Sequence, residues 1–252
     1  METDERHRLI AAIVRARRTV GVAELASETG VSEVTVRRDL GVLEERGVLR
    51  RRHGGAESLL GRGEDPGFGQ RRIENAEGKA RVAAAAAALI QDGESLILDS
   101  GTTAVELARG LAGRRATVMP LSLQAATALA DAAGIELVLP GGSIRRGEQA
   151  FAGPTAEAGV RALRVDTAVV VPCGLTLADG LTAYDLADAS IKRAAAEVAA
   201  RTIVLCDEGK WGRVALARVG ALGMASVLVT DHACTPEETE YLTTHGIEVV
   251  TA

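Results

Sequence analysis

Residues 31–55 read VSEVTVRRDLGVLEERGVLRRRHGG, a helical pattern followed by a dense basic run. Val36, Leu40 and Leu43 are spaced at i, i+4 and i+7, so they share one face of a helix, which we expect to be the core face. Ser32 is placed to cap this helix by accepting a hydrogen bond from a free N–H of its first turn. The pattern therefore predicts an amphipathic helix with one buried side.

The opposite face of this helix carries groups suited to the DNA major groove. At 100° per residue, the side chains that point outward belong to Val34, Thr35, Arg37 and Arg38. Guanidinium groups pair with guanine edges, hydroxyls bind phosphate, and an apolar side chain contacts the thymine methyl group. The alternative is a solvated surface on which the two arginines pair with Glu33, Glu44 or Glu45.

A basic strand and a tight turn follow once Gly47 has ended the helix. They contain Arg50, Arg51, Arg52 and His53. Phosphate contacts from such residues add salt-sensitive affinity that carries no sequence information. This segment is expected to be the wing of a winged helix-turn-helix domain.

Two more short helices are expected ahead of this motif. Asp4 is placed to cap the first, with Leu9 and Ile13 facing inward. The second begins near Val22 and stops at Gly30. We therefore assign residues 1–56 to a DNA-binding domain.

Charge and composition agree with this division. Residues 1–56 carry a net charge of +2, whereas the whole chain of 252 residues carries −5. Aromatic residues are only 2% of the chain, which argues against a single-strand binder that stacks bases. The three cysteines show no metal-ligand spacing, and neither a metal nor a cofactor is expected. With no signal peptide and no apolar run of membrane-spanning length, we expect a cytoplasmic protein without a membrane partner.

The remaining sequence predicts a linker and an α/β domain. Residues 57–72 are rich in glycine and show no clear period, so we interpret them as a linker. Residues 73–252 alternate apolar strands with alanine-rich helices, which is typical of a parallel sheet covered on both faces. The expected strands include Ser95–Leu98, Ile135–Leu139, Thr167–Val171, Thr202–Cys206 and Ser226–Thr230.

A candidate phosphate cradle follows the first of these strands. Its residues are Asp99, Ser100, Gly101, Thr102 and Thr103. A glycine turn at a helix N-terminus exposes backbone N–H groups, and threonine hydroxyls add donors. The alternative is an ordinary strand-to-helix turn with threonine capping.

Other candidate ligand-binding residues also follow strands or lie on an adjacent helix. They are Gly141, Gly142, Gly174, Lys192, Asp207 and Lys210. Ligands of open α/β sheets collect outside the carboxyl ends of the strands. We therefore expect these residues to converge on the cradle.

The DNA-binding motif resembles the signature of the DeoR family of transcription regulators. The matching residues run from Val31 to Leu40 and from Gly47 to Ala56. The resemblance implies that Ser32, Thr35, Arg37 and Arg38 lie at the DNA and that the basic segment forms a wing. Asp39 is expected to be a structural partner for an arginine.

The resemblance continues through the second domain. It begins at Phe68, Arg71, Asn75 and Lys79. It then includes the cradle, the pair Gly141-Gly142, and Asp207 with Lys210. It implies a Rossmann-like α/β domain similar to ribose-5-phosphate isomerase that binds a phosphorylated sugar or related metabolite. The chain departs from the family pattern at Met119–Ser122 and at Glu208–Trp211.

Together these features predict a repressor of a carbohydrate or related metabolic operon, controlled by a phosphorylated metabolite. Its partners would be double-stranded operator DNA and the metabolite, and two-fold operators favour a homo-oligomer, a dimer or a tetramer. One alternative is a sugar-phosphate isomerase with an appended DNA module, although no carboxylate is singled out as a catalytic base and no catalytic residue is assigned. Another is an architectural DNA-binding protein whose second domain only oligomerises.

Overall fold

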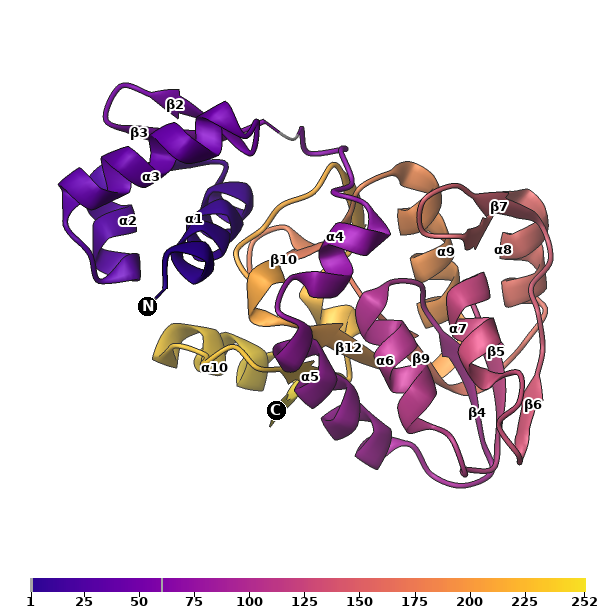
Figure 1. The fold of residues 1–252 in the computed structure, drawn as a ribbon. Coiled ribbons are helices and arrows are strands. Elements are labelled where there is room, and N and C mark those ends of the chain that lie inside the picture. Colours follow the sequence, from indigo (N-terminus) through magenta and orange to yellow (C-terminus); the bar gives the residue numbers. More distant parts are fainter. Residues whose placement is uncertain (1, 60) are drawn as a thin grey trace. The chain divides into compact units, whose positions relative to one another are not determined.

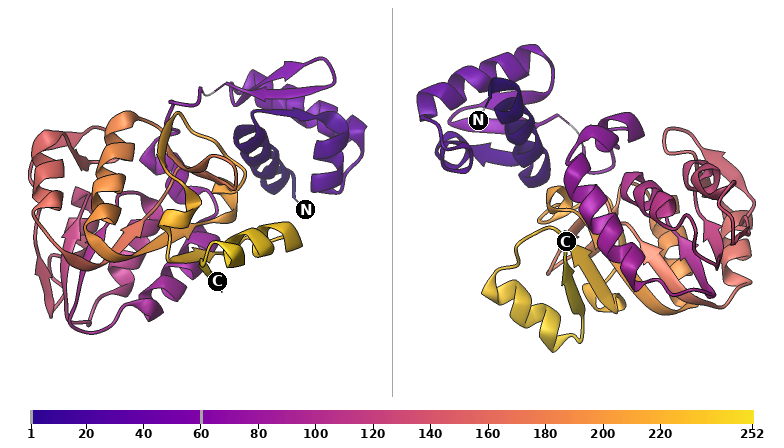
Figure 2. Two further views of the ribbon diagram at one scale, coloured as in Figure 1. Left: turned by 180° about the vertical axis from the view of Figure 1, so that it is seen from behind. Right: turned by 60° about the horizontal axis from the view of Figure 1, so that its bottom comes forward.

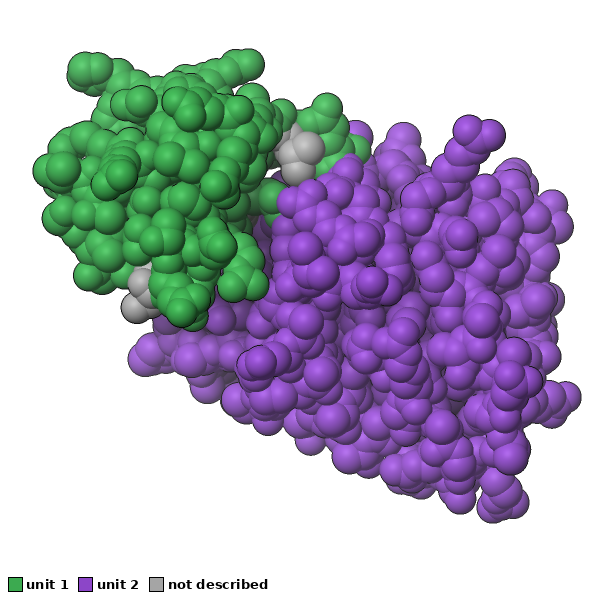
Figure 3. Space-filling model, in the orientation of Figure 1, with its two compact units in different colours: residues 1–64 green, residues 65–252 purple. Residues whose placement is uncertain are grey.

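The computed structural model describes residues 2–59 and 61–252, which form two compact units. The first unit spans residues 1–64 and the second residues 65–252 (Figure 3). Within the described ranges, no helix is both long enough and apolar enough to cross a membrane.

The first unit contains three helices and a small antiparallel sheet. Its elements are α1 (Thr3–Arg17), β1 (Thr19–Gly21), α2 (Val22–Thr29), α3 (Glu33–Glu45), β2 (Leu49–Arg52) and β3 (Gly55–Ser58). The strand order is β1-β3-β2. Ten buried residues from all these elements form one core, including Val36, Leu40 and Leu43, as the helical spacing predicts. This is the winged helix-turn-helix arrangement.

The inward face of α1 differs from the expectation. Leu9 is 36% exposed, whereas Ile10 and Val14 are buried in the core. The helix also begins one residue before Asp4, and Glu2 occupies the capping position. The reason is a phase error: the inward stripe of α1 is offset from Leu9 by one residue, which is 100° around the helix.

The second unit contains a seven-stranded parallel sheet in the order β15-β14-β12-β9-β4-β5-β6. Its strands are β4 (Glu94–Leu98), β5 (Ala116–Pro120), β6 (Ile135–Leu137), β9 (Val165–Val170), β12 (Ala199–Cys206), β14 (Val227–Thr230) and β15 (Glu248–Thr251). All five strands expected from the sequence are present, with bounds that differ by one to three residues at an end. The predicted α/β fold with a parallel sheet is confirmed.

Helices cover both faces of this sheet (Figures 1 and 2). The helices are α4 (Phe68–Ile73), α5 (Ala76–Leu89), α6 (Thr102–Gly110), α7 (Leu123–Leu129), α8 (Pro154–Arg161), α9 (Leu186–Glu197) and α10 (Pro236–Thr244). Leu96 and Leu98 pack with α5 and α6, while the intervening Ile97 packs with α8 and α9. This alternation is the period of a strand buried on both sides.

Smaller elements complete the unit. They are the hairpin of β7 (Ser143–Arg145) and β8 (Ala150–Ala152), the sheet of β10 (Gly174–Thr176), β11 (Gly180–Ala183) and β13 (Ala217–Gly220), and the 3₁₀ turns η1 (Glu208–Lys210) and η2 (Leu222–Met224). The segment interpreted as a linker is partly structured, because its first two residues end β3 and its last five belong to α4. A helix of six residues is too short to show a period in sequence.

The strand order places a topological switch point between β4 and β9. From β4 the chain moves outward through β5 to β6, and from β9 it moves the opposite way through β12 and β14 to β15. In open α/β sheets, the crevice at the carboxyl ends of the strands flanking such a point is where ligands bind. The loops that follow β4 and β9 are therefore the expected location of a ligand-binding site.

Candidate DNA-binding and effector sites

The recognition helix α3 has the geometry that its sequence predicts. The Ser32 side chain accepts a hydrogen bond from the Thr35 N–H at 3.2 Å, so it caps the helix. Val34 is 73% exposed, and Arg37 and Arg38 are also exposed. An apolar side chain as open as Val34 has no packing role, so it is free for a thymine methyl group.

One of the two helix arginines is paired within the protein. Arg37 donates to Glu33 at 2.6 Å across one turn, as the solvated-face alternative allows. Both side chains are about half exposed, and an exposed pair of this kind contributes roughly 0–1 kcal/mol. A phosphate or guanine edge can therefore replace Glu33 at small cost.

Asp39 anchors the recognition helix to α1. Arg6 binds its carboxylate at 2.6 Å, and the His7 ring lies 2.9 Å from it. Burial disfavours the charged carboxylate, but the hydrogen bonds from Arg6 and His7 outweigh burial and lower the pKa of Asp39. Asp39 is thus a structural residue, and its partner is an arginine of another helix.

The basic segment forms β2 and its turn to β3. Arg50, Arg51, Arg52 and His53 are all exposed. Glu57 on β3 pairs with Arg50 at 3.4 Å and with Arg52. The Arg51 N–H donates to Glu44 of α3 at 2.8 Å, which ties the wing to the end of the recognition helix. The wing thus presents its cations to solvent from a fixed strand.

In the second unit, Asp99 joins the two strands of the switch point. Its carboxylate accepts the Ser100 N–H and the Val171 N–H, both at 2.7 Å, so it links the end of β4 to the end of β9. Lys192 of α9 lies 2.9 Å from the same carboxylate and 2.7 Å from Asp188, one turn earlier. All three charged side chains are 2–3% exposed.

Burial and charge act in opposite directions in this group. Burial raises the pKa of Asp99. At Asp188 burial is the largest single effect and raises the pKa, but Lys192, Arg145 and Arg71 together outweigh it, so the pKa is lowered. At Lys192 the two carboxylates raise the pKa above its ordinary value despite burial. The bonds of Asp99 and Lys192 are directed to protein groups, so the geometry gives them a positioning function beside the cradle.

The cradle itself is built as the sequence predicts. Gly101 has a φ of 107°, which favours glycine, and α6 begins at the next residue without a side-chain cap. The first-turn N–H groups of a helix have no intrahelical partners, so they are available to an anion. Among the described residues, the Thr103 Oγ1 atom is buried without a hydrogen-bond partner, and Thr102 is buried beside it. A phosphate placed here would meet free N–H groups of the first turn, and the unpartnered hydroxyl of Thr103 belongs to the same turn.

Asp207 and Lys210 lie after β12, together with a lysine from α5. Lys210 lies 3.5 Å and Lys79 lies 3.8 Å from the Asp207 carboxylate. Burial lowers the pKa of Lys79 to about 8, although Asp207 partly opposes the effect. The position of Lys79 is signalled in sequence only by the family pattern. Lys79 adds a buried ammonium beside the partly buried Lys210 after β12.

Outside the cradle, two of the candidate glycines, Gly142 and Gly174, serve close packing. A Cβ on Gly142 would lie 2.8 Å from the carbonyl oxygen of Ala152, and one on Gly174 would lie 2.3 Å from that of Arg213. Gly141 and Gly142 have φ values of 77° and 88° and are exposed. Gly174 is buried in β10, so its backbone contacts protein rather than solvent.

The first departure from the family pattern has a structural explanation. Leu121 is buried in the core between the sheet and α8, and the retained Ser122 caps α7 by accepting the Ala125 N–H at 3.2 Å. In the second departure, Trp211 stacks on the His232 ring at 4.4 Å. Both changes add apolar or aromatic contacts beside the strand ends.

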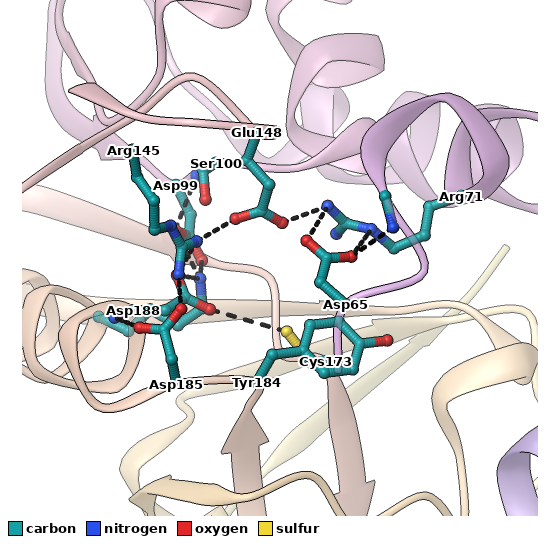
Figure 4. Close-up of polar contacts among 12 residues, drawn as sticks. Asp65, Arg71, Asp99, Ser100, Arg145, Glu148, Cys173, Tyr184, Asp185 and Asp188 are labelled. Atoms are coloured by element: carbon teal, nitrogen blue, oxygen red, sulfur yellow. Dashed lines mark hydrogen bonds and ion pairs between the residues drawn. The ribbon is translucent and has the colours of Figure 1, made fainter. Parts of the chain in front are cut away.

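A charged cluster that the residue patterns do not reveal lies beside the cradle (Figure 4). Glu148, in the β7–β8 turn, pairs with both Arg71 of α4 and Arg145 of β7. Arg145 also pairs with Asp185, the residue that caps α9. In sequence only Arg71 is marked, by the family pattern, and 77 positions separate it from Glu148.

Comparison with known proteins identifies both units. Residues 6–60 match the DeoR-like helix-turn-helix domain, and residues 74–232 match the DeoR C terminal sensor domain. The putative aga operon transcriptional repressor of Escherichia coli O157:H7 is 34% identical over 98% of this chain and 93% of its own length. The glycerol-3-phosphate regulon repressor of Escherichia coli K12 is 27% identical over 99% of each chain.

Solved structures with partial similarity include ribose 5-phosphate isomerase A from Methanocaldococcus jannaschii. It is 21% identical, with a TM-score of 0.41 over 54% of this chain and 55% of that chain. The full-length sorbitol operon regulator SorC from Klebsiella pneumoniae is 15% identical, with a TM-score of 0.42 over 88% and 94% of the two chains. The two domain matches and the near full-length relatives show that the chain belongs to the DeoR family of transcriptional regulators.

Proposed function

We propose that this regulator is a repressor of a carbohydrate or related metabolic operon and that a phosphorylated sugar or similar metabolite controls its binding to operator DNA. The observation that carries the proposal is the cradle at the switch point, Gly101–Thr103, in the same chain as the recognition helix. A helix N-terminus with an unpartnered buried hydroxyl selects an anion with several acceptor oxygens, and a phosphate ester has them.

Two relatives support the operon class. Their names describe repressors of the aga operon and of the glycerol-3-phosphate regulon. Control would require that the metabolite bind more tightly to the conformation that does not hold the operator, since a ligand shifts an equilibrium only by its difference in affinity. Binding as a dimer or tetramer to a two-fold operator and a cytoplasmic location are part of the same proposal.

The contacts near the cradle favour sensing over isomerisation. A catalytic base must be free to take a proton from the substrate. Asp99 and Asp188 are both bound to Lys192, and Asp207 lies between two lysines. We expect no turnover of ribose 5-phosphate, and measurable isomerase activity would contradict this part of the proposal.

The test uses the full chain. Operator sequences are selected from random duplexes, and binding to the selected duplex is followed by fluorescence anisotropy with sugar phosphates and the matching free sugars. One phosphorylated compound should change operator affinity while its free sugar has no effect. A regulator that binds the duplex but responds to no phosphorylated compound would be an architectural protein, and the effector part of the proposal would be wrong.

A further inference from the structure

The β7–β8 turn places a buried carboxylate between two arginines. The Glu148 side chain is 4% exposed, and its two oxygens accept from Arg71 and from Arg145 (Figure 4). Two guanidinium groups around one anion are the arrangement that proteins use to bind phosphates and carboxylates. Here the anion is supplied by the chain itself.

This arginine pair is connected to the cradle by a row of alternating charges. Arg145 lies 3.6 Å from Asp188, which is bound to Lys192, which in turn is bound to Asp99 at the start of the cradle. Glu148 and the cradle therefore belong to one continuous network of ion pairs. A new anion at the cradle changes the electrostatic balance of every member.

The same carboxylate holds the segment that leads from the DNA-binding unit. Helix α4 is short, has no fully buried residue and packs against α6, the helix of the cradle. Arg71 also pairs with Asp65 at 3.0 Å, but Asp65 lies in the same segment. In the described part of the chain, Glu148 is the only ion-pair partner that ties Arg71 to the rest of the sensor.

We propose that Glu148 is an internal counter-anion that holds α4 on the sensor, and that an anionic group of the effector releases α4 by taking its place on Arg71 and Arg145. The inference rests on the proposed function, because it assumes a phosphorylated effector at the neighbouring cradle. It adds a second anion subsite, for a phosphate or carboxylate group. It also explains how binding at the sensor would reach the segment that leads from the DNA-binding unit, because α4 belongs to that segment. In the first state Glu148 holds Arg71 and α4 on the sensor; in the second the effector's anion has displaced Glu148 and α4 is released.

Competition between Glu148 and the effector has a measurable consequence. Removing the charge of Glu148 should release α4 without any ligand, because the arginine then keeps only Asp65, in its own segment, and a weak contact with the Tyr184 ring, 5.9 Å away. Adding an anion to the unmodified chain should have the same effect. In a chain that lacks the Glu148 charge, an added anion should cause little further release of α4.

Trypsin cleavage of the full chain provides the assay. Cleavage after Arg71 or Arg72 requires α4 to open, whereas Arg62 lies exposed ahead of it and serves as an internal reference. The ratio of the two cleavage rates follows the open population of α4 when opening is fast. The chains compared are the unmodified protein, Glu148→Gln, and the control Glu157→Gln, which removes a surface carboxylate paired with Arg161.

We expect Glu148→Gln to raise the ratio on the order of tenfold and Glu157→Gln to leave it unchanged. Inorganic phosphate, compared with chloride at equal ionic strength, should raise the ratio in the unmodified chain and have little further effect in Glu148→Gln. An unchanged ratio in a folded Glu148→Gln chain would overturn the inference, and so would an equal phosphate effect in both chains.

Thermal unfolding of the unmodified chain in phosphate separates the two proposals. If phosphate raises the unfolding temperature but leaves the cleavage ratio unchanged, this inference is wrong and the proposed effector class stands. If phosphate changes neither, displacement of Glu148 by phosphate is refuted and the cradle of the proposed function loses its support as well. The phosphate experiment on the unmodified chain needs no variant, so it tests the displacement of Glu148 even if Glu148→Gln does not fold.

Discussion

Replacing Lys192 by methionine tests whether the charged group beside the cradle is structural. Methionine keeps an unbranched side chain of similar length and removes the ammonium that lies 2.7 Å from Asp188 and 2.9 Å from Asp99. The two carboxylates would remain buried, and Arg145, at 3.6 Å from Asp188, is too distant to replace both contacts. The expected result is a large loss of stability in the second unit.

The magnitude follows from the burial of the group. Removing one partner of a buried ion pair costs about 3–5 kcal/mol. For a unit of this size, each 1 kcal/mol lowers the unfolding temperature by about 2–4 °C, so the expected decrease is roughly 6–20 °C. Asp99 limits the loss, because burial already raises its pKa and it can take up a proton in the variant.

The loss should depend on pH in a defined direction. Without the ammonium, the buried carboxylates have a higher pKa in the folded state than in the unfolded chain. The folded state then binds more protons, so the unfolding free energy of the variant decreases as pH rises from about 5 to 8. Far-UV circular dichroism of the full chain, heated at several pH values, measures both effects.

Two comparisons make the result decisive. Arg161→Met removes a cation from the exposed pair with Glu157 and should cost at most about 1 kcal/mol. The double variant Asp99→Asn, Lys192→Met removes one charge of each sign and should recover part of the loss. If Lys192→Met unfolds within 2–3 °C of the unmodified chain at every pH, roughly the effect of 1 kcal/mol, the structural reasoning is refuted. If such a stable variant also lost its effector response, Lys192 would contact the effector directly, as the sequence predicts.

Three further predictions concern the two sites. Arg37→Ala or Arg38→Ala should cost about 1–3 kcal/mol of discrimination between operator and random duplex in anisotropy titrations, whereas equal loss on both duplexes would make them phosphate contacts. The pair Thr102→Ala, Lys210→Ala should abolish the effector response in the same titrations and leave operator binding intact; an unchanged response would place the effector elsewhere. Because the Lys79 pKa is about 8, phosphate affinity measured by calorimetry should fall as pH rises through 8, where the ammonium loses its proton. A phosphate affinity that is constant between pH 7 and 9 would exclude Lys79 from the site.

Much of the DNA-binding unit is predictable because its signals are local. The spacing of Val36, Leu40 and Leu43 sets the buried face of α3, and Ser32 sets its beginning. The inward face of α1 was harder to predict, since alanines surround its apolar residues and leave the stripe poorly defined. The error at Leu9 has this cause.

In the proposed effector site, too, local features are predictable from sequence and long-range contacts are not. The proposed cradle is local, and the sequence predicts its strand, glycine turn and helix; its role in binding stays a prediction. The contacts of Glu148 join segments that are distant in sequence and irregular in structure, so no period marks them. The glycines show a related limit, because a glycine required for close packing, such as Gly174, has the same sequence appearance as one that faces a ligand.

An aspartate at the start of the proposed anion site calls for a physical explanation, because a free carboxylate would repel a phosphate. In this structure the charge of Asp99 is used internally: its oxygens accept two backbone N–H groups and face the Lys192 ammonium. These bonds fix the ends of β4 and β9 at the switch point, so the N–H groups of α6 are held in position before any ligand arrives. Preorganised donors of this kind bind an anion without the cost of ordering the loop. Lys192 also binds Asp188, which lies 3.6 Å from Arg145. Asp99, which fixes the cradle, is therefore connected through Lys192 and Asp188 to Arg145, the arginine that shares Glu148 with Arg71 of α4.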